Sequence, residues 1–196
     1  PDKMIGAVAT GVIAAASPAE VTRASDIVQA CVINTPALTE AMFGPNGVVE
    51  GGSAEKIFLD HSTTIADKTR ELAARLRAET GMRWVDAPVS GGPQGAVDAA
   101  LTIMVGGTTT ALERARPLFA LLGPTVVHMG ESGAGQTTKA CHQLALLVTA
   151  QGAAEALTLA GRCGLDVERV RQVMMGGVAA SRVLDIFGTR MASRDF

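Results

Sequence analysis

The sequence is poor in aromatic side chains. Its 196 residues include no Tyr, one Trp and five Phe, against 22 Gly and a hydrophobic content of 47%. An all-β sandwich normally uses more aromatic and β-branched residues, so the composition argues against that class. A glycine-rich chain with few large rings instead suits the close packing of strands against helices in an α/β protein.

Cysteine is also scarce. The three cysteines are odd in number, and no two stand at a metal-ligand spacing, so neither a disulfide framework nor a metal site is predicted. They are Cys31, Cys141 and Cys163. Because each lies in an apolar run, we expect buried free thiols, a reducing compartment and hence a cytoplasmic protein.

Neither sign of charge is in excess. The formal net charge is −2, which argues against nucleic acid and anionic membranes as partners. No apolar run reaches membrane-spanning length without interruption, so no membrane partner is predicted. The chain opens at Pro1 with no signal-peptide pattern, and we expect further sequence upstream of it.

Apolar segments of strand length alternate with helical patterns over the first two thirds of the chain. The predicted strands are Ile27–Ile33, Ile57–Leu59, Arg83–Val85, Leu101–Val105 and Val126–Met129. The first is a nearly continuous apolar stretch and is predicted to be buried on both faces. Helical patterns at Ile65–Thr80 and Thr110–Leu122 lie between later strands. This alternation predicts a parallel, doubly wound sheet.

The pattern changes after Gly135. Residues Thr137–Cys163 contain no Pro and have apolar side chains on most sides, which predicts one long and largely buried helix. A second helix is predicted at Asp166–Met175, and no further strand. We therefore expect an α/β domain over residues 1–132 and the start of an all-α domain over residues 133–196.

Three predicted strands end in polar or glycine-rich segments. These segments are Asn34–Pro36, Asp60–Thr64 and Asp86–Gly92. Ligands of open α/β sheets bind at the carboxyl ends of the strands. In the third segment Gly91 and Gly92 allow close approach of the backbone to a ligand, and Ser90 adds a hydroxyl, which suits a carboxylate. Taken alone, the composition of this segment favours a plain strand-to-helix turn rich in glycine, without a ligand.

Lys139 lies one turn inside the predicted long helix. A lysine in an apolar helix is unusual, and burial lowers its pKa into a range useful for general acid–base chemistry. A lysine whose amine reaches solvent from an apolar stem is the alternative. His142 and Gln143 follow at i+3 and i+4 and are expected on the same helix face, although His142 alone also fits a structural histidine.

Four segments, in this order, resemble the β-hydroxyacid dehydrogenase family. They are Asp60–Thr63, Asp86–Gly92, Leu101–Gly107, and Gly133–Gln136 followed by Lys139. The resemblance implies a Rossmann-type domain, a long interdomain helix and an all-α domain. The family's Gly-rich dinucleotide fingerprint is expected before Pro1, and its C-terminal part after Phe196, so the predicted fold is a truncated version of this architecture.

The resemblance also implies an activity, a cofactor and residue roles. It implies hydride transfer between NAD or NADP and a small β-hydroxyacid or its semialdehyde, in a homo-oligomer (dimer or tetramer). Lys139 takes the family's acid/base position. The implied substrate-binding residues are Ser90, Gly91, Gly92, His142 and Gln143, and the implied cofactor-binding residues are Asn34, Thr35, Pro36 and Thr63. His142 replaces the family's usual Asn.

Two other functions remain open from the sequence. One is a non-catalytic binding or scaffold protein on the same fold, against which the retained Lys139 and Ser90 argue. The other is an imine reductase of the same superfamily. Imine reductases act on substrates without a carboxylate, so the intact segment Ser90–Gly92 argues against this reading.

Overall fold

The computed structural model describes residues 2–195, and these form two compact units that divide between Lys139 and Ala140. The helix elements of the first unit are α1 Asp2–Ala9, α2 Pro18–Ala24, α3 Thr35–Phe43, the 3-10 turn η1 Val48–Gly51, α4 Ala66–Thr80, α5 Gly92–Val97, α6 Thr109–Leu122 and the start of α7 Ala134–Arg162. Its strands are β1 Ile27–Ala30, β2 Ile57–Asp60, β3 Arg83–Asp86, β4 Val89–Ser90, β5 Thr102–Gly106 and β6 Thr125–Gly130. The predicted boundary at 132/133 stays a prediction.

The six strands form one mixed sheet. Strands β1, β2 and β3 are parallel neighbours, and β5 and β6 form a second parallel pair. Strand β5 runs antiparallel to both β3 and β4. Strand β3 lies before Pro88 and β4 after it, and both pair with β5 in the same register. The prediction of alternating strands and helices in a doubly wound fold is confirmed, whereas the sheet is only partly parallel. The short strand β4 had no separate signal, because it continues β3 past a proline.

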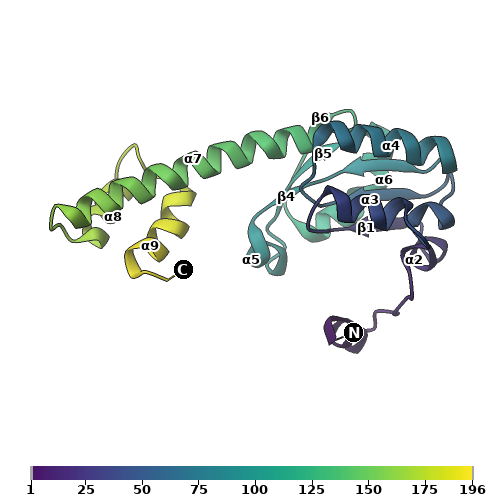
Figure 1. Ribbon diagram of the computed structural model, residues 1–196, viewed down its shortest axis with the longest axis horizontal. Helices are drawn as coiled ribbons and strands as arrows, with labels where there is room; N and C mark the ends of the chain where they lie inside the picture. The colour runs from purple at the N-terminus through teal and green to yellow at the C-terminus, as the bar shows by residue number, and fades with distance from the viewer. Residues whose placement is uncertain (1, 196) are drawn as a thin grey trace. The chain divides into compact units, whose positions relative to one another are not determined.

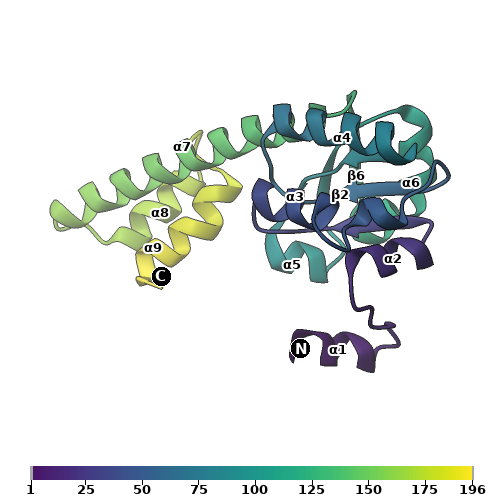
Figure 2. The same ribbon diagram turned by 45° about the vertical axis from the view of Figure 1, so that its right-hand side comes forward.

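Two apolar cores lie on opposite faces of the sheet. Side chains alternate along each strand, so in β2 Ile57 and Leu59 face the core that includes α6, while Phe58 faces the core that includes α3 and α4. Phe58 and Trp84 meet edge-to-face in the second core, with ring centroids 4.7 Å apart. Helices therefore cover both faces of the sheet (Figures 1 and 2).

The prediction that residues 27–33 form a strand buried on both faces is wrong. Strand β1 ends at Ala30, and only Val28 of its four residues is buried. Among the described residues β1 pairs with β2 alone, so one edge of the strand is open. An apolar run of this length is typical of a central strand, whereas β1 lies at the edge of the sheet.

The second unit is helical throughout its described residues. After α7 it contains α8 Val167–Met175, the π-helical turn η2 Leu184–Gly188 and α9 Thr189–Ser193. The prediction of a long helix followed by a second helix is confirmed. The predicted burial of the long helix is wrong, because Leu144, Leu147 and Val148 are each more than 60% exposed.

Exposure corrects one conclusion drawn from apolar runs, because all three cysteines are exposed rather than buried.

Helix α7 is the one described helix whose length and composition suffice to cross a membrane, with 17% of the apolar window buried. Polar residues, among them Gln143, Gln151 and Glu155, interrupt its apolar sequence. The expectation that no apolar run reaches that length without interruption is therefore unchanged.

Candidate functional site

The carboxyl ends of the three parallel strands lie side by side, as the sequence predicts. Ala30 of β1 is in register with Asp60 of β2, and Asp60 is in register with Asp86 of β3. The segments that follow these strands, which contain most of the predicted site residues, therefore start from one edge of the sheet. Both aspartates are fully buried, which places two carboxyl groups beneath this edge.

Asp60 is buried without a full set of partners. Its Oδ1 accepts a hydrogen bond from the backbone N–H of Ser62 at 2.9 Å, while Oδ2 has no partner in the structure. Loss of hydration raises the pKa of Asp60 to about 6; hydrogen bonds from Ser62 oppose the rise, and nearby Asp86 adds to it. The buried carboxyl group therefore titrates near neutrality.

The Asp86 carboxylate binds the start of α7. Oδ1 accepts from the backbone N–H of Gly133 at 2.7 Å, and Oδ2 accepts from that of Gln136 at 3.0 Å. The first N–H groups of a helix have no partner within the helix, so Asp86 supplies acceptors from another element. Burial raises the pKa of Asp86, and these N–H donors oppose the rise.

The segment Ser90–Gly92 is a sharp turn from β4 into α5. Gly91 has φ 135° and Gly92 has φ 66°, backbone conformations that side chains with a Cβ rarely adopt. A Cβ at Gly91 would lie 3.0 Å from Leu101 Cδ2, whereas one at Gly92 would meet nothing within 4 Å. The backbone at Gly92 thus faces open space, which leaves room for a ligand.

Lys139 reaches this same turn. Only 7% of the residue is exposed, and Nζ donates a hydrogen bond of 2.8 Å to the carbonyl of Val89. Loss of hydration lowers the pKa of the Lys139 amine, and no ion pair among residues 2–195 includes it. The structure therefore brings Lys139 beside the residue that precedes Ser90, and the reading of Lys139 as a solvent-exposed lysine is wrong.

The predicted cofactor residues lie at the start of α3 and in the loop after β2, and hydrogen bonds connect these two segments. The backbone N–H of Val32 donates to Ser62 Oγ at 2.9 Å, and that of Ile65 donates to Thr35 Oγ1 at 3.3 Å. Asn34 caps α3 by accepting from the N–H of Ala37 at 2.9 Å, with Pro36 in the first turn. Thr63 is exposed between the bonded positions.

Gln136 connects these loops to α7. The side chain is 1% exposed, its Oε1 accepts from the N–H of Thr64 at 3.0 Å, and its Nε2 donates to the carbonyl of Ser62 at 2.7 Å. Thr63 therefore lies between two residues that bind Gln136. The first turn of α7 is thus hydrogen-bonded to two elements. Gln136 connects it to the loop after β2, and Asp86 connects it to β3.

His142 and Gln143 belong to the second unit. His142 Nδ1 lies 3.2 Å from Gln143 Oε1, and both residues are half-buried. Helix α7 is unbroken from Ala134 to Arg162, so the helical spacing on which their prediction depends is present. Their contact with a substrate stays a prediction.

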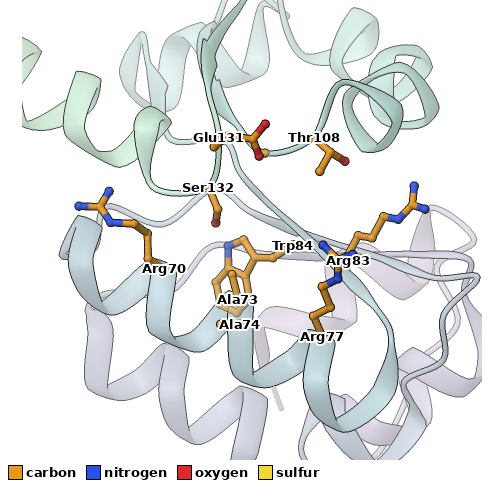
Figure 3. A pocket seen from close by; sticks show the side chains of 10 residues that line it. Arg70, Ala73, Ala74, Arg77, Arg83, Trp84, Thr108, Glu131 and Ser132 are labelled. Atoms are coloured by element: carbon orange, nitrogen blue, oxygen red, sulfur yellow. The ribbon is translucent and has the colours of Figure 1, made fainter.

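A separate hollow of about 320 Å³ lies in the first unit against α4, β3 and the turn that precedes α7. Figure 3 shows the Ser132 hydroxyl and the Trp84 indole pointing toward one another across it, with Arg70, Arg77 and Arg83 around the rim. None of the predicted site residues lines it. The hollow and the strand-end site are therefore different places in the fold.

Sequence reasoning missed three residues that organise the site. The sequence marks Asp60 and Asp86 only as strand ends, and Gln136 only as part of a glycine-rich segment. The position of the aspartates at the ends of apolar strands is only a weak signal, because Asp is rarely fully buried. Gln136 gave no such signal, since its partners Ser62 and Thr64 lie more than 70 positions away.

Comparison with known proteins agrees with this architecture. Residues 1–130 match the protein family described as the NAD binding domain of 6-phosphogluconate dehydrogenase. Residues 133–196 match a second protein family, described as "NAD-binding of NADP-dependent 3-hydroxyisobutyrate dehydrogenase". Together they cover the strand-end loops, Lys139 and the helical unit.

Named relatives come from several bacteria. The chain is 40% identical over 186 residues to 2-hydroxy-3-oxopropionate reductase of Escherichia coli, covering 95% of this chain and 63% of the relative. It is 35% identical over 167 residues to 2-(hydroxymethyl)glutarate dehydrogenase of Eubacterium barkeri, covering 85% and 55%. The chain thus spans about three fifths of the length of the curated relatives it matches.

Solved structures show the same fold. A 3-hydroxyisobutyrate dehydrogenase from Salmonella typhimurium is 28% identical, with a TM-score of 0.89 over 100% of this chain and 68% of its own. The Mycobacterium tuberculosis 3-hydroxyisobutyrate dehydrogenase with L-serine is 32% identical, with a TM-score of 0.81 over 91% and 60%. An imine reductase from Pseudomonas sp. is 20% identical, which is a likeness of fold alone. The chain belongs to the β-hydroxyacid dehydrogenase family.

Proposed function

We propose that the protein containing this chain transfers a hydride between NAD or NADP and a small β-hydroxyacid or its semialdehyde, with Lys139 as the acid/base. The observation that carries the proposal is the position of the Lys139 amine, buried and bonded to Val89 beside the Ser90–Gly92 turn. The relatives named for hydroxyacid substrates support the substrate class.

The loops after β1 and β2 fit a dinucleotide. They lie at the carboxyl ends of parallel strands, where open α/β sheets bind such ligands, and the hydrogen bonds of Ser62 and Thr35 hold them together. Ile33 and Ile65 in these loops are 89% and 66% exposed, so apolar surface is available to a flat ring. We assign Asn34, Thr35, Pro36 and Thr63 to the cofactor, which supplies the hydride chemistry when bound.

The chain's own residues provide substrate binding and proton transfer. We assign the substrate carboxylate to the Ser90 hydroxyl and the backbone of Gly91 and Gly92. Contact of His142 and of Gln143 with the substrate stays a prediction from the family resemblance. The Lys139 amine, released from the Val89 carbonyl, gives a proton to the carbonyl oxygen in reduction. In oxidation the neutral amine takes the hydroxyl proton.

Replacement of Lys139 tests the assignment. In the intact protein we expect Lys139→Ala to fold and to lose roughly 10²- to 10⁴-fold in turnover, the usual contribution of a positioned acid or base. Assays with 2-hydroxy-3-oxopropionate, 3-hydroxyisobutyrate and a cyclic imine, each with NADH and NADPH, distinguish the substrate class and cofactor. Turnover retained by Lys139→Ala would contradict the role of Lys139.

The same experiments address the scaffold reading. A scaffold protein is expected to bind neither NADH nor NADPH in a fluorescence titration of the intact protein. A homo-oligomer and a cytoplasmic location stay predictions. The exposed apolar side chains of α7, among them Leu144 and Leu147, supply surface that an oligomer contact would cover, and light scattering measures the oligomeric state.

A further inference from the structure

The Asp86 carboxylate is placed to hold the first turn of α7 against the sheet. It is fully buried and accepts hydrogen bonds from the N–H groups of both Gly133 and Gln136. Charge-assisted bonds from backbone N–H groups to a carboxylate are shorter and stronger than neutral ones. The negative charge also lies at the positive end of the helix. Asp86 is thus a strong acceptor at the end of the helix that carries Lys139.

Glycines permit this close approach from two sides. A Cβ at Gly106 would lie 2.6 Å from both carboxylate oxygens of Asp86. A Cβ at Gly135 would lie 2.4 Å from the carbonyl oxygen of Met104 and 2.7 Å from that of Asp86. Both positions therefore exclude a side chain unless the helix or the strands move. Glycine at these two positions thus allows the end of β5 and the start of α7 to pack directly against the Asp86 carboxylate.

Lys139 lies at i+3 from Gln136, one turn beyond the second Asp86 contact. Its Nζ bonds to the carbonyl of Val89, which lies three residues after Asp86. Asp86 and Val89 oppose β5 in one register, so they belong to a single stretch of backbone. That stretch therefore contacts α7 twice, at the first turn through Asp86 and one turn later through Val89.

We propose that Asp86 is a positioning residue for Lys139: by binding the N–H groups of Gly133 and Gln136 it fixes the first turn of α7 and so places the lysine amine beside Val89 and the Ser90–Gly92 turn. The inference depends on the proposed function only in taking Lys139 as the acid/base. Asp86 itself does not touch the reacting atoms. Its effect is transmitted through the helix backbone.

The test compares Asp86→Asn with Asp166→Asn in the intact protein. Asparagine keeps the shape of Asp86 but has one acceptor oxygen, so one of the two N–H groups loses its partner and meets an NH₂ group. Asp166 caps α8 by accepting from the N–H of Arg169 at 3.1 Å, which makes its replacement the same chemical change at another helix start. Circular dichroism checks that both variants fold.

The first readout does not depend on activity. The rate at which an amine-acylating reagent modifies Lys139 is measured by peptide mass spectrometry, with the half-buried Lys68, whose amine pairs with Glu71, as the internal reference. Lys139 is 7% exposed and is expected to react slowly in the wild type and in Asp166→Asn. In Asp86→Asn we expect faster modification of Lys139 and faster hydrogen exchange in the peptide that contains Gly133 and Gln136.

The second readout is kinetic. We expect kcat of Asp86→Asn to fall about 10- to 100-fold, the usual cost of displacing a catalytic group, with the KM for the cofactor nearly unchanged. Asp166→Asn should retain wild-type kcat. If Asp86→Asn does not fold, Gly135→Ala replaces it, because the added Cβ would lie 2.4 Å from the Met104 carbonyl oxygen and 2.9 Å from Asp86 Oδ2 and would displace the same helical turn without changing the chemistry of Asp86.

The outcomes separate the two proposals. Unchanged labelling of Lys139 together with unchanged kcat in a folded Asp86→Asn protein overturns the positioning role. Turnover retained by Lys139→Ala overturns the proposed function instead. In that case faster labelling of Lys139 in Asp86→Asn still supports the positioning of the amine by Asp86.

Discussion

Gln136 accepts a hydrogen bond of 3.0 Å from the backbone N–H of Thr64, across 72 positions of sequence. The same side chain donates to the Ser62 carbonyl at 2.7 Å, so one buried amide pairs both of its groups with the loop after β2. Because Gln136 also belongs to the first turn of α7, the loop with the predicted cofactor residue Thr63 and the helix with Lys139 share a fixed contact.

Replacement of Gln136 is expected to weaken both the fold and the binding of cofactor. Gln136→Met keeps the approximate size of the side chain but leaves the Thr64 N–H and the Ser62 carbonyl unpaired. An unpaired buried polar group costs about 1–3 kcal/mol, so we expect a loss of roughly 2–4 kcal/mol in the free energy of unfolding. Urea denaturation measures the loss, and fluorescence titration with NADPH measures the affinity.

Gln151→Met is the matched control for this prediction. Gln151 is exposed and bonds to Glu155 one turn away, so its replacement is expected to change stability by less than about 0.5 kcal/mol. Equal effects at the two positions would contradict a special role for the Gln136 contact.

Asp60 predicts a pH dependence of stability. Folding raises the pKa of Asp60 to about 6, above its unfolded value, so folding favours the protonated carboxyl group. The stability that this group contributes is fully present below the unfolded pKa and is lost as pH rises through the folded pKa. The loss amounts to about 3 kcal/mol, from a shift of about two pKa units at about 1.4 kcal/mol each.

Asp60→Asn should remove this dependence. Asparagine is neutral at every pH, keeps an oxygen for the Ser62 N–H and places an NH₂ group where Oδ2 has no partner. The stability of Asp60→Asn relative to the wild type should therefore increase as pH rises from about 4 to about 8. Urea unfolding at several pH values measures this, with exposed Asp98→Asn as the control. A constant difference across that range would contradict the buried titration of Asp60.

The pH dependence of turnover follows from the depressed pKa of Lys139. Oxidation needs the neutral amine, so kcat/KM for the hydroxyacid should rise with pH through the Lys139 pKa, which lies below the usual lysine value. Reduction needs the protonated amine, so its rate should fall with pH through the same pKa. Rate profiles in both directions measure it.

Lys139→Arg provides the check on this assignment. Arginine stays protonated throughout the accessible pH range, so the variant cannot act as the base in oxidation. We expect the rise of the oxidation rate with pH to disappear in Lys139→Arg. Persistence of the same pH profile in the variant would assign the titration to a different group.

The sequence predicted well those features that depend on local pattern. The strands at Ile57–Leu59 and Arg83–Val85, the helix between them and the turn at Gly91 and Gly92 follow from apolar periodicity and glycine. The hydrogen-bond partners of polar side chains could not be predicted from the sequence. Nothing local to Gln136 indicates Ser62 and Thr64 as partners, because sheet register and helix packing decide which distant residues meet.

Burial was the least predictable property. Cys31 and Cys141 lie in apolar runs, yet both are exposed, because exposure depends on whether another element covers that side of the strand or helix. Conversely, Asp60 and Asp86 are charged residues, yet they are fully buried, because they continue central strands by one residue. Residue type indicates only a tendency to be buried, and the position of a residue in the fold determines whether it is buried.

Two substitutions of Asn34 separate its predicted contact with the cofactor from its contribution to stability. Its side chain caps α3 through the N–H of Ala37, and aspartate caps as well as asparagine, whereas alanine does not. Asn34→Asp should therefore keep wild-type stability, while Asn34→Ala should lose about 1 kcal/mol in urea denaturation. Since a dinucleotide is anionic, the added charge of Asn34→Asp should weaken NADH and NADPH binding, the more so at low salt. Wild-type affinity in Asn34→Asp at low salt would place the cofactor phosphates away from this loop.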